Sequence, residues 1–288
     1  LANSKSEVIR QKASAQDMFD LGAIEMETGP IHTVQPLHIR IPKGRMVAVT
    51  GVSGSGKTTS ILESLVPALQ AMIRKESMPA HVKSIRAEGI RNVKLIDSTP
   101  IGANVRSTVA TYANVHDDLR KLFAKLPAAK ATSVSASDFS YNTGSLRCPV
   151  CDGTGTISLD VQFLPDVDIP CPECHGSRYA QQSEEFRYEA ADGKSYSLPD
   201  LMKMDVADAQ KALARYKALE SRLESLNRIG LGYITLGEAT TSLSGGEAQR
   251  LKLAAEMGIR QDDSLFVFDE PTIGLHPLDT QTLIRVFQ

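Results

Sequence analysis

The sequence predicts an α/β fold in which a glycine-rich loop joins a strand to a helix. A short apolar run at residues 45–50 has β-strand character and leads into the glycines that begin at Gly51. Apolar residues then recur at helical spacing within 59–73, at Ile61, Leu65, Leu69 and Ile73. A second apolar run, Leu265 to Phe268, ends in two carboxylates, as expected for a buried parallel strand. This order of strand, loop, helix and later strand is typical of α/β proteins that bind phosphate.

The other segments predict a largely helical middle with short strands before it. Residues 37–41 alternate like a strand ahead of a turn, and residues 93–96 predict another core strand. The segment 108–126 has helical character, and 131–138 is a polar linker. One long amphipathic helix is predicted by apolar residues at steps of three and four, namely Val206, Ala209, Leu213, Tyr216, Leu219, Leu223 and Leu226.

The composition is that of a soluble globular protein with an uneven charge distribution. Of 288 residues, 42% are hydrophobic and 23% are charged, and the formal net charge is −2. Residues 1–147 carry 19 basic and 12 acidic side chains, whereas residues 148–288 carry 13 and 22. No apolar run approaches the roughly 20 residues that span a bilayer, and no signal peptide is present, so we expect a cytoplasmic protein without membrane contact. Leu1 in place of Met suggests a fragment, a processed form or a trimmed chain.

The segment from Gly51 to Thr58 matches the phosphate-loop pattern G-x-x-x-x-G-K-[ST]. Its glycines allow backbone N–H groups to close around an anion, and the helix N-terminus adds positive partial charge. Lys57 is expected to reach the β- and γ-phosphates and Thr58 to ligate Mg²⁺. The alternative is a glycine-rich turn that only caps a helix. The residues predicted to bind ATP here are Gly51, Ser53, Gly54, Ser55, Gly56, Lys57, Thr58 and Thr59.

Asp269 and Glu270 follow the second apolar strand and predict the other half of such a site. A carboxylate at the end of a strand beside a phosphate loop can hold Mg²⁺, which is the role predicted for Asp269. Glu270 could polarise the attacking water, so the candidate catalytic residues are Lys57, Asp269 and Glu270. Alone, such a strand end is commonly just solvated. The presence of a phosphate loop favours the functional interpretation.

The segment Leu243 to Arg250 reads LSGGEAQR and is the most discriminating part of the chain. Ser244 followed three residues later by Glu247 forms a capping box, so one interpretation is simply a well-capped helix. However, two glycines at a helix start, Gly245 and Gly246, leave N–H groups bare for a closely approaching anion. With its phosphate loop and its Asp-Glu-Pro strand end, the chain resembles the ATP-binding-cassette (ABC) ATPases. That resemblance implies that these residues contact the γ-phosphate held by a partner domain, together with Ser244.

All four cysteines lie in one segment with the spacing C-x2-C-x19-C-x2-C, at Cys148, Cys151, Cys171 and Cys174. Paired knuckles of this kind are typical of a structural Cys₄ zinc site. Gly153 and Gly176 follow the knuckles, where the backbone must turn tightly, and Ile157, Leu159, Val161 and Phe163 alternate like a strand between them. Two disulfides or four reduced buried thiols are the alternatives.

A zinc module lies between the phosphate loop and the segment Leu243 to Arg250, called the signature below. This order resembles the UvrA family, the damage-recognition ATPases of bacterial nucleotide excision repair. The similarity extends over about residues 41–278. About 97 residues separate Gly51 from Cys148, which resembles the second, C-terminal ATPase half of that family. The segments that carry the resemblance are Thr50–Lys57, Pro100–Gly102, Ala110–Tyr112, Phe163–Val167, Gly230–Tyr233 and Asp269–His276.

Three features depart from the family pattern. Ser98 stands where the family has a glutamine that senses Mg²⁺ and the γ-phosphate. The segment 142–147 lacks a lysine-glycine-glycine found in many members, although it retains Arg147. The switch histidine expected well after Glu270 does not occur before Gln288. The first two suggest a divergent paralogue and the third suggests truncation.

The resemblance implies an ATPase that uses ATP, Mg²⁺ and Zn²⁺ and grips damaged double-stranded DNA, with a UvrB-like partner, a second ATPase half and a homodimer. DNA contact is expected at backbone phosphates and at altered duplex shape. The basic segment 83–147 is the candidate surface, although solvated basic side chains are the alternative for each residue. The individual candidates are Arg106, Arg120, Lys121 and Arg147.

The predicted domain organisation follows from the motifs. Residues 1–107 form the N-terminal part of the ATP-binding core, and 108–257 form an inserted helical and signature region with the zinc module at 140–182. Residues 258–288 complete the core with the Asp-Glu strand. Two other functions are carried as alternatives. One is a UvrA-like ATPase for drug self-resistance, and the other is a non-catalytic zinc scaffold.

Overall fold

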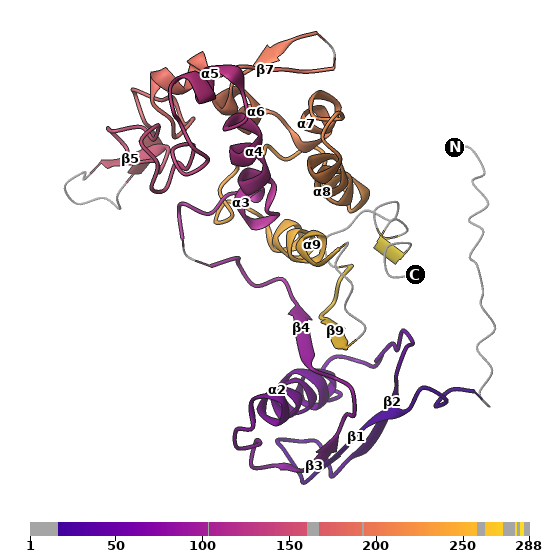
Figure 1. Cartoon of the computed structure of the whole chain (residues 1–288). Coiled ribbons are helices and arrows are strands. Elements are labelled where there is room, and N and C mark those ends of the chain that lie inside the picture. The colour runs from indigo at the N-terminus through magenta and orange to yellow at the C-terminus, as the bar shows by residue number, and fades with distance from the viewer. Residues whose placement is uncertain are drawn as a thin grey trace, which may run out of the picture. The chain divides into compact units, whose positions relative to one another are not determined.

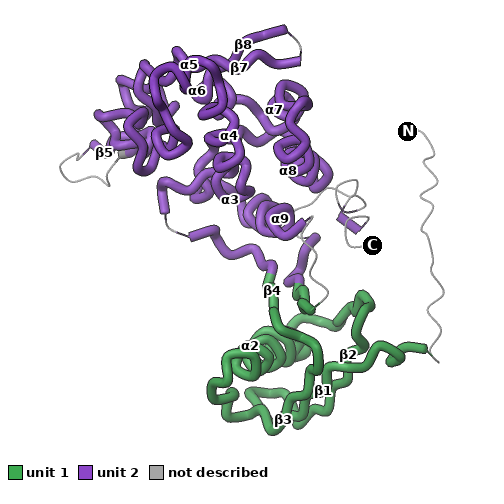
Figure 2. Tube along the Cα trace, in the orientation of Figure 1, with its two compact units in different colours: residues 1–95, 261–267 green, residues 96–260, 268–288 purple. Residues whose placement is uncertain are grey.

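The computed structural model describes residues 17–102, 104–159, 167–191, 193–257, 263–272, 280, 283 and 284. The expectations that concern Val161, Phe163 and the segment 273–276 therefore lie outside the described residues. The chain divides into two compact units, the first formed by residues 1–95 and 261–267 and the second by residues 96–260 and 268–288 (Figure 2).

The first unit contains an antiparallel sheet with the strand order β2-β1-β3, formed by β1 (Ala23–Thr28), β2 (His38–Pro42) and β3 (Val82–Arg86) (Figure 1). The predicted strand at 37–41 is thus confirmed as β2. Side chains alternate along β1, and its buried Ile24 and Met26 join Leu65 and Leu69 in the core of this unit. The sheet packs its apolar face against the helical segment that follows the glycine-rich loop.

That helical segment consists of α1 (Lys57–Ser60), a π-helical turn η1 (Ile61–Leu65) and α2 (Val66–Arg74). The helix predicted over 59–73 is confirmed, with a widened turn inside it. Pro67 has no N–H to donate and its ring clashes with a regular α-helical carbonyl four residues earlier, which accounts for a wide turn at this place. Lys75 in the left-handed conformation ends α2.

The strand predicted over residues 45–50 is not formed. Residues 46–50 have no regular secondary structure, and Met46, Val47 and Val49 are 69%, 45% and 52% exposed. A strand needs the backbone of a neighbouring strand to satisfy its N–H and C=O groups. No described residue supplies such a ladder to this segment, so its apolar pattern is present without the strand that the pattern predicts.

Strands β4 (Asn92–Ile96) and β9 (Ser264–Phe268) pair with each other. The Asn92 N–H donates to the Asp263 carbonyl oxygen at 3.3 Å, and the Asp269 N–H donates to the Ile96 carbonyl oxygen at 3.1 Å. The start of β4 thus pairs with the start of β9, and the end of β4 with the end of β9, so the two strands run parallel. Both predicted strands are confirmed. All five residues of β9 are half-buried rather than fully buried.

The second unit is mainly helical (Figure 1). Its core contains many buried leucines. Leu119, Leu219 and Leu223 are fully buried where α4 and α8 pack together. The prediction of helix within 108–126 is confirmed by α3 and α4, which are separated at Asn114 in the left-handed conformation. The helices are α3 (Val109–Tyr112), α4 (Val115–Phe123), α5 (Pro127–Ala131), α6 (Leu198–Lys203), α7 (Val206–Ala212), α8 (Lys217–Arg228) and α9 (Gly245–Glu256).

The single long helix predicted from Val206 to Leu226 is wrong. The chain forms two helices that pack against each other, α7 and α8, with a break at residues 213–216. Tyr216 takes an extended conformation and begins α8. Because both helices turn their apolar side chains toward the same core, a spacing of three and four residues continues across the break. Periodicity alone therefore could not separate one helix from a helical pair.

Short β elements complete the second unit. Strands β5 (Thr156–Leu159) and β6 (Val167–Pro170) form an antiparallel hairpin between the two cysteine pairs, so the predicted strand is confirmed over its described part. A 3₁₀ turn η2 (Gln181–Glu185) and the small pair β7 (Tyr188–Glu189) and β8 (Ser195–Tyr196) follow. Among the described residues, no helix is both long enough and apolar enough to cross a bilayer.

Candidate functional site

The glycine-rich loop is an exposed turn that begins a helix. Gly54 and Gly56 have φ angles of 75° and 86°, which residues with a Cβ rarely adopt. A Cβ added to Gly56 would also lie 2.5 Å from Val34 Cγ2. Gly56 is the residue that caps α1, and residues 51–55 are exposed. The loop therefore presents its backbone to solvent at a helix start, which is the arrangement that a phosphate requires.

Lys57 closes over this loop. Its Nζ donates to the carbonyl oxygens of Gly51 at 2.9 Å and Val52 at 2.8 Å. The Lys57 ammonium is thus held at the mouth of the loop, where an arriving phosphate would compete with two carbonyl oxygens for it. Thr58 is exposed on the first turn of α1, and Thr59 is half-buried beside it.

The signature segment starts helix α9 with the predicted capping box, which is confirmed. The Ser244 N–H donates to Glu247 Oε2 at 2.8 Å, and the Glu247 N–H donates to Ser244 Oγ at 3.4 Å. Tyr233 Oη donates to Glu247 Oε1 at 2.6 Å. Burial opposes ionisation of Glu247, but these hydrogen bonds outweigh it and lower the pKa of its carboxyl. Ser244 and Gly245 remain exposed at the tip of the helix.

The loop after β4 packs directly against the signature helix. A Cβ on Gly245 would meet the Ser98 carbonyl oxygen at 3.2 Å, so the glycine allows this close approach. Lys252, two turns along α9, donates to Asp97 Oδ1 at 2.5 Å and to the Thr99 carbonyl oxygen and hydroxyl, both at 2.9 Å. The loop that carries Ser98 is therefore held between the start of α9 and Lys252.

Gln249 ties the same helix to the predicted Mg²⁺ carboxylate. It is 5% exposed, and its Nε2 donates to the Ile96 carbonyl oxygen at 3.2 Å and to the Asp269 carbonyl oxygen at 2.7 Å. The ends of β4 and β9 are thus joined through one buried amide. Glu270, the next residue, has a φ of 44° and is exposed.

The four cysteines come together as a buried cluster. Their Sγ atoms all lie within 4.8 Å of one another, and none forms a disulfide. The Sγ atoms of Cys148 and Cys171 are 3.9 Å apart, and those of Cys151 and Cys174 are 3.7 Å apart. A tetrahedron of thiolates with Zn–S bonds of about 2.3 Å has edges of about 3.8 Å, so the cluster has the size that zinc requires.

The four thiols differ in how readily they ionise, because burial raises the pKa of Cys148 and raises that of Cys174 to about 12. The Gly155 N–H donates to Cys151 Sγ at 3.3 Å. Burial opposes ionisation of Cys171, yet the backbone N–H groups of Cys174 and Glu173 lower the pKa of its thiol to about 7. Gly153 has a φ of 78°, and a Cβ there would lie 1.8 Å from the Tyr141 carbonyl oxygen, which confirms that the first knuckle needs a glycine.

Arg178 is a buried cation next to the second knuckle. It is 6% exposed, lies over the Tyr141 ring at 5.3 Å and donates to the carbonyl oxygens of Val105 and Gly153 at 3.3 and 3.4 Å. Burial lowers the pKa of its guanidinium, and the Tyr141 hydroxyl and the Cys151 and Cys174 thiols act in the opposite direction. A permanent positive charge in this place suits four neighbouring thiolates.

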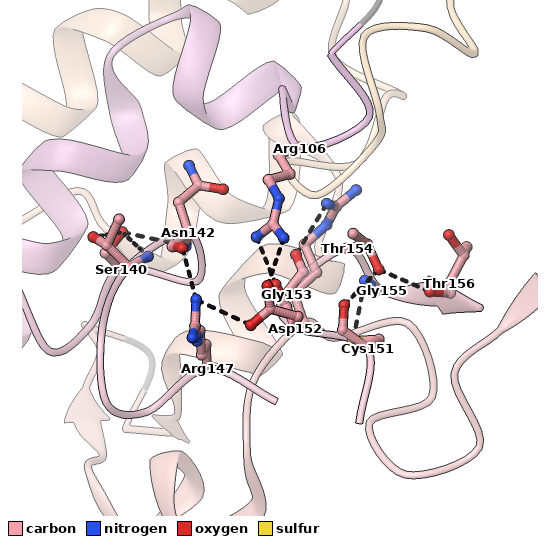
Figure 3. Close-up of polar contacts among 12 residues, drawn as sticks. Arg106, Ser140, Asn142, Arg147, Cys151, Asp152, Gly153, Thr154, Gly155 and Thr156 are labelled. Carbon is pink, nitrogen blue, oxygen red and sulfur yellow. Dashed lines mark hydrogen bonds and ion pairs between the residues drawn. The ribbon is translucent and has the colours of Figure 1, made fainter. Parts of the chain in front are cut away.

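The four predicted DNA-contact residues occupy two places. Arg106 and Arg147 meet at the carboxylate of Asp152, in the first cysteine knuckle (Figure 3). Arg120 and Lys121 lie on α4, where they pair with Asp117 at 2.6 Å and Asp118 at 3.3 Å. These ion pairs do not connect Arg120 and Lys121 on α4 with Arg106 and Arg147 at Asp152.

Several residues at these sites were not predicted from the sequence. Asp97, Gln249 and Lys252 act through contacts between segments more than 150 residues apart, which a spacing within one motif cannot reveal. Asp152 lies inside the cysteine pattern and could have been noticed as an acidic residue shortly after the predicted Arg147. Its partners come from 46 residues before it and from beside it in the chain.

The glycine-rich loop, the signature helix and the cysteine cluster together agree with the ABC-type P-loop fold with a Cys₄ module that the sequence predicted. The crystal structure of UvrA2 from Deinococcus radiodurans matches 99% of this chain and 33% of its own chain, with a TM-score of 0.83 and 38% sequence identity. No protein-family model matches the chain.

Curated relatives carry the name UvrABC system protein A. The protein from Streptococcus mutans is 40% identical over 270 residues, and that from Lactococcus lactis is 42% identical over 258 residues. These matches cover 92% and 88% of this chain but only 28% and 27% of the relatives. The relative from Helicobacter pylori is 38% identical over 267 residues. The chain is therefore a partial UvrA-like protein that spans somewhat over a quarter of the curated relatives it matches.

Proposed function

We propose that this chain is an ATP-binding and DNA-binding part of a UvrA-like subunit that recognises damage in nucleotide excision repair. The observation that carries the proposal is the similarity to UvrABC system protein A across 92% of the chain, with phosphate loop, signature and cysteine module all present. Hydrolysis of ATP by this chain, with a partner domain or a second protomer, belongs to the same proposal.

The nucleotide is proposed to bind at the exposed loop from Gly51 to Thr59. In this proposal Lys57 leaves the loop carbonyls for the β- and γ-phosphates, and Thr58 and Asp269 hold Mg²⁺. Glu270 polarises the attacking water. Ser244, Gly245 and Gly246 meet the γ-phosphate of a partner, which their position at the exposed start of α9 supports.

The four cysteines are proposed to hold one structural Zn²⁺. The metal would join the two knuckles around the β5–β6 pair of strands. This pair has little buried apolar surface of its own, and its Ile157, which packs on the cysteine cluster, is only half-buried. Each sulfur enters as thiolate, and Arg178 offsets part of the charge. Zinc would thereby fix the position of Asp152 and its two arginines relative to the rest of the unit.

The partners proposed are damaged double-stranded DNA, a UvrB-like protein and a second ATPase half or protomer. Arg106, Arg120, Lys121 and Arg147 are proposed to contact DNA phosphates. The exposure of Lys121 and Arg147 supports this role, whereas Arg106 and Arg120 are half-buried, at 29% and 25% exposed. We further propose that the chain divides into domains at 1–107, 108–257 with a zinc module at 140–182, and 258–288. A cytoplasmic location is also proposed, and four cysteines without disulfides support it.

Binding to damaged and undamaged duplexes, each with and without ATP, tests this function. The expected result is tighter binding to the damaged duplex, a preference that depends on ATP, and an affinity that falls steeply with salt. Equal affinity for the two duplexes at every salt concentration, with or without ATP, would contradict a role in damage recognition. Lys57→Ala serves as the nucleotide-binding control in the same assay.

A further inference from the structure

Two arginines converge on one carboxylate in the first cysteine knuckle (Figure 3). Arg106 Nη2 donates to Asp152 Oδ2 at 2.8 Å, and its Nη1 donates to the Asp152 carbonyl oxygen at 2.5 Å. Arg147 Nη1 lies 3.0 Å from Asp152 Oδ1 and also donates to the Asn142 carbonyl oxygen at 3.2 Å. Asp152 thus uses both carboxylate oxygens, one for each guanidinium.

The backbone holds this arrangement in place. Asp152 has a φ of 51°, a left-handed conformation that Asp and Asn tolerate better than most residues. Gly153 fits tightly under the Tyr141 carbonyl, and Tyr141 Oη donates in turn to the Arg106 carbonyl oxygen at 3.0 Å. Arg106 and Asp152 are therefore tied to the same aromatic residue, so the carboxylate cannot drift away from the guanidinium without moving the knuckle.

The charge balance of this group is unequal. Two guanidinium groups face one carboxylate, and the side chains of Arg106, Arg147 and Asp152 are 29%, 39% and 55% exposed. A guanidinium pair that can hold a carboxylate can also hold a phosphate, because both anions present paired oxygens to planar N–H donors. Ion pairs this exposed add little to folding stability, so their main effect is on the charge that an approaching polyanion meets.

We propose that Asp152 weakens the grip of Arg106 and Arg147 on the DNA backbone by cancelling one of their two positive charges. The inference rests on the proposed DNA binding and names the residue that sets its strength. Asp152 itself is not a DNA contact but a positioning and neutralising residue that acts through the arginines. Backbone affinity held down in this way lets the protein leave undamaged DNA readily.

The test compares duplex binding by the 288-residue chain, unchanged and as Asp152→Asn, over a range of salt concentrations. Asn keeps the left-handed backbone and removes one negative charge. One additional effective positive charge is expected to steepen the slope of log K against log salt by about 0.9. The same relation gives a gain in affinity of roughly tenfold near 0.1 M salt, equal for damaged and undamaged duplexes because their phosphates are alike.

Two controls separate this effect from simpler ones. Asp208→Asn removes the same charge from an exposed pair with Lys211 and is expected to leave the slope unchanged. In an Arg106→Gln, Arg147→Gln background, Asp152→Asn is expected to bring no gain, since Asp152 acts through those arginines. Zinc content and thermal unfolding of each variant show that the knuckle is intact.

The outcomes are distinct. If the unchanged chain does not bind DNA, the proposed function fails. If it binds and Asp152→Asn binds with the same slope and affinity, or if Asp208→Asn gives the same gain, the role of Asp152 is overturned. A gain that persists without the two arginines also overturns it.

Discussion

Lys252 Nζ lies 2.5 Å from Asp97 Oδ1, so the signature helix α9 is bonded to the loop that carries Ser98. The two side chains are 15% and 20% exposed. Burial acts against ionisation of Asp97, but hydrogen bonds from Lys252 and Thr99 outweigh it and lower the pKa of the carboxyl. With Gln249 bonded to the Asp269 carbonyl, α9 holds both the Ser98 loop and the predicted Mg²⁺ carboxylate.

Replacing Lys252 with Met tests this connection. Met keeps the length of the side chain but removes three donors, which leaves the Asp97 carboxylate with the two hydrogen bonds from the Thr99 N–H and hydroxyl. We expect a loss of about 2 kcal/mol in the free energy of unfolding, measured by denaturant titration at neutral pH. Because the pKa of Asp97 is lowered in the folded state, this stabilisation is present above its unfolded value and disappears as the pH falls through the folded value.

The matched control is Lys211→Met, which breaks an exposed ion pair with Asp208 and should leave stability unchanged. An effect of Lys252→Met no larger than that of the control would show that the contact with Asp97 contributes nothing.

Lys57→Ala is expected to abolish ATP binding while the fold stays intact. Lys57 is held by loop carbonyls rather than by core contacts, so its loss removes the proposed phosphate ligand without creating a cavity. Nucleotide affinity by calorimetry and thermal unfolding without nucleotide separate the two effects. Lys211→Ala, an exposed lysine in the other unit, is the control. Unchanged ATP affinity would remove the phosphate-loop assignment.

The purified chain is expected to contain one zinc ion, and Cys148→Ser is expected to lose it. A structural zinc site contributes directly to folding, so the midpoint of thermal unfolding should fall by on the order of 10 °C. Metal analysis and thermal unfolding with and without chelator give both quantities. Ser158→Ala, on the exposed face of β5, should keep the metal. A chain with no zinc and two disulfides by mass would overturn the Cys₄ site.

His116 predicts a pH dependence of stability. It is 3% exposed, and its Nε2 lies 2.7 Å from Tyr179 Oη, which donates its own proton to the Phe139 carbonyl oxygen. His116 is therefore the donor and carries its proton on Nε2. Burial, assisted by the positive charge of Arg120, lowers the pKa of His116 to about 3.

The unfolded chain protonates this histidine near pH 6.5, whereas the folded chain does not, so the unfolded state binds more protons as the pH falls. Stability should fall by up to about 1.4 kcal/mol per pH unit between about 6.5 and 3. Denaturant titrations at pH 7.5, 6.5 and 5.5 should show this slope in the unchanged chain and a smaller one in His116→Gln. Parallel slopes in the two proteins would contradict it.

Short-range patterns were the part of the fold that sequence reasoning predicted well. The capping box at Ser244 and Glu247, the strands at 92–96 and 264–268 and the cysteine cluster all depend on residues whose spacing carries the information. The strand predicted over residues 45–50 was wrong, because a strand depends on its neighbour as well as on its own apolar pattern. The break between α7 and α8 was missed, because both helices bury their apolar faces and the apolar spacing continues across the break.

The sequence by itself determined the motifs of this protein: a phosphate loop, a signature helix and four cysteines at zinc spacing. Each is set by local geometry, since a few consecutive residues must present N–H groups or thiolates together. Only the tertiary structure decided which charges meet. Lys252 reaches Asp97 across 155 residues, and Arg106 reaches Asp152 across 46, because burial brings distant segments together and an ion pair forms wherever opposite charges then lie close.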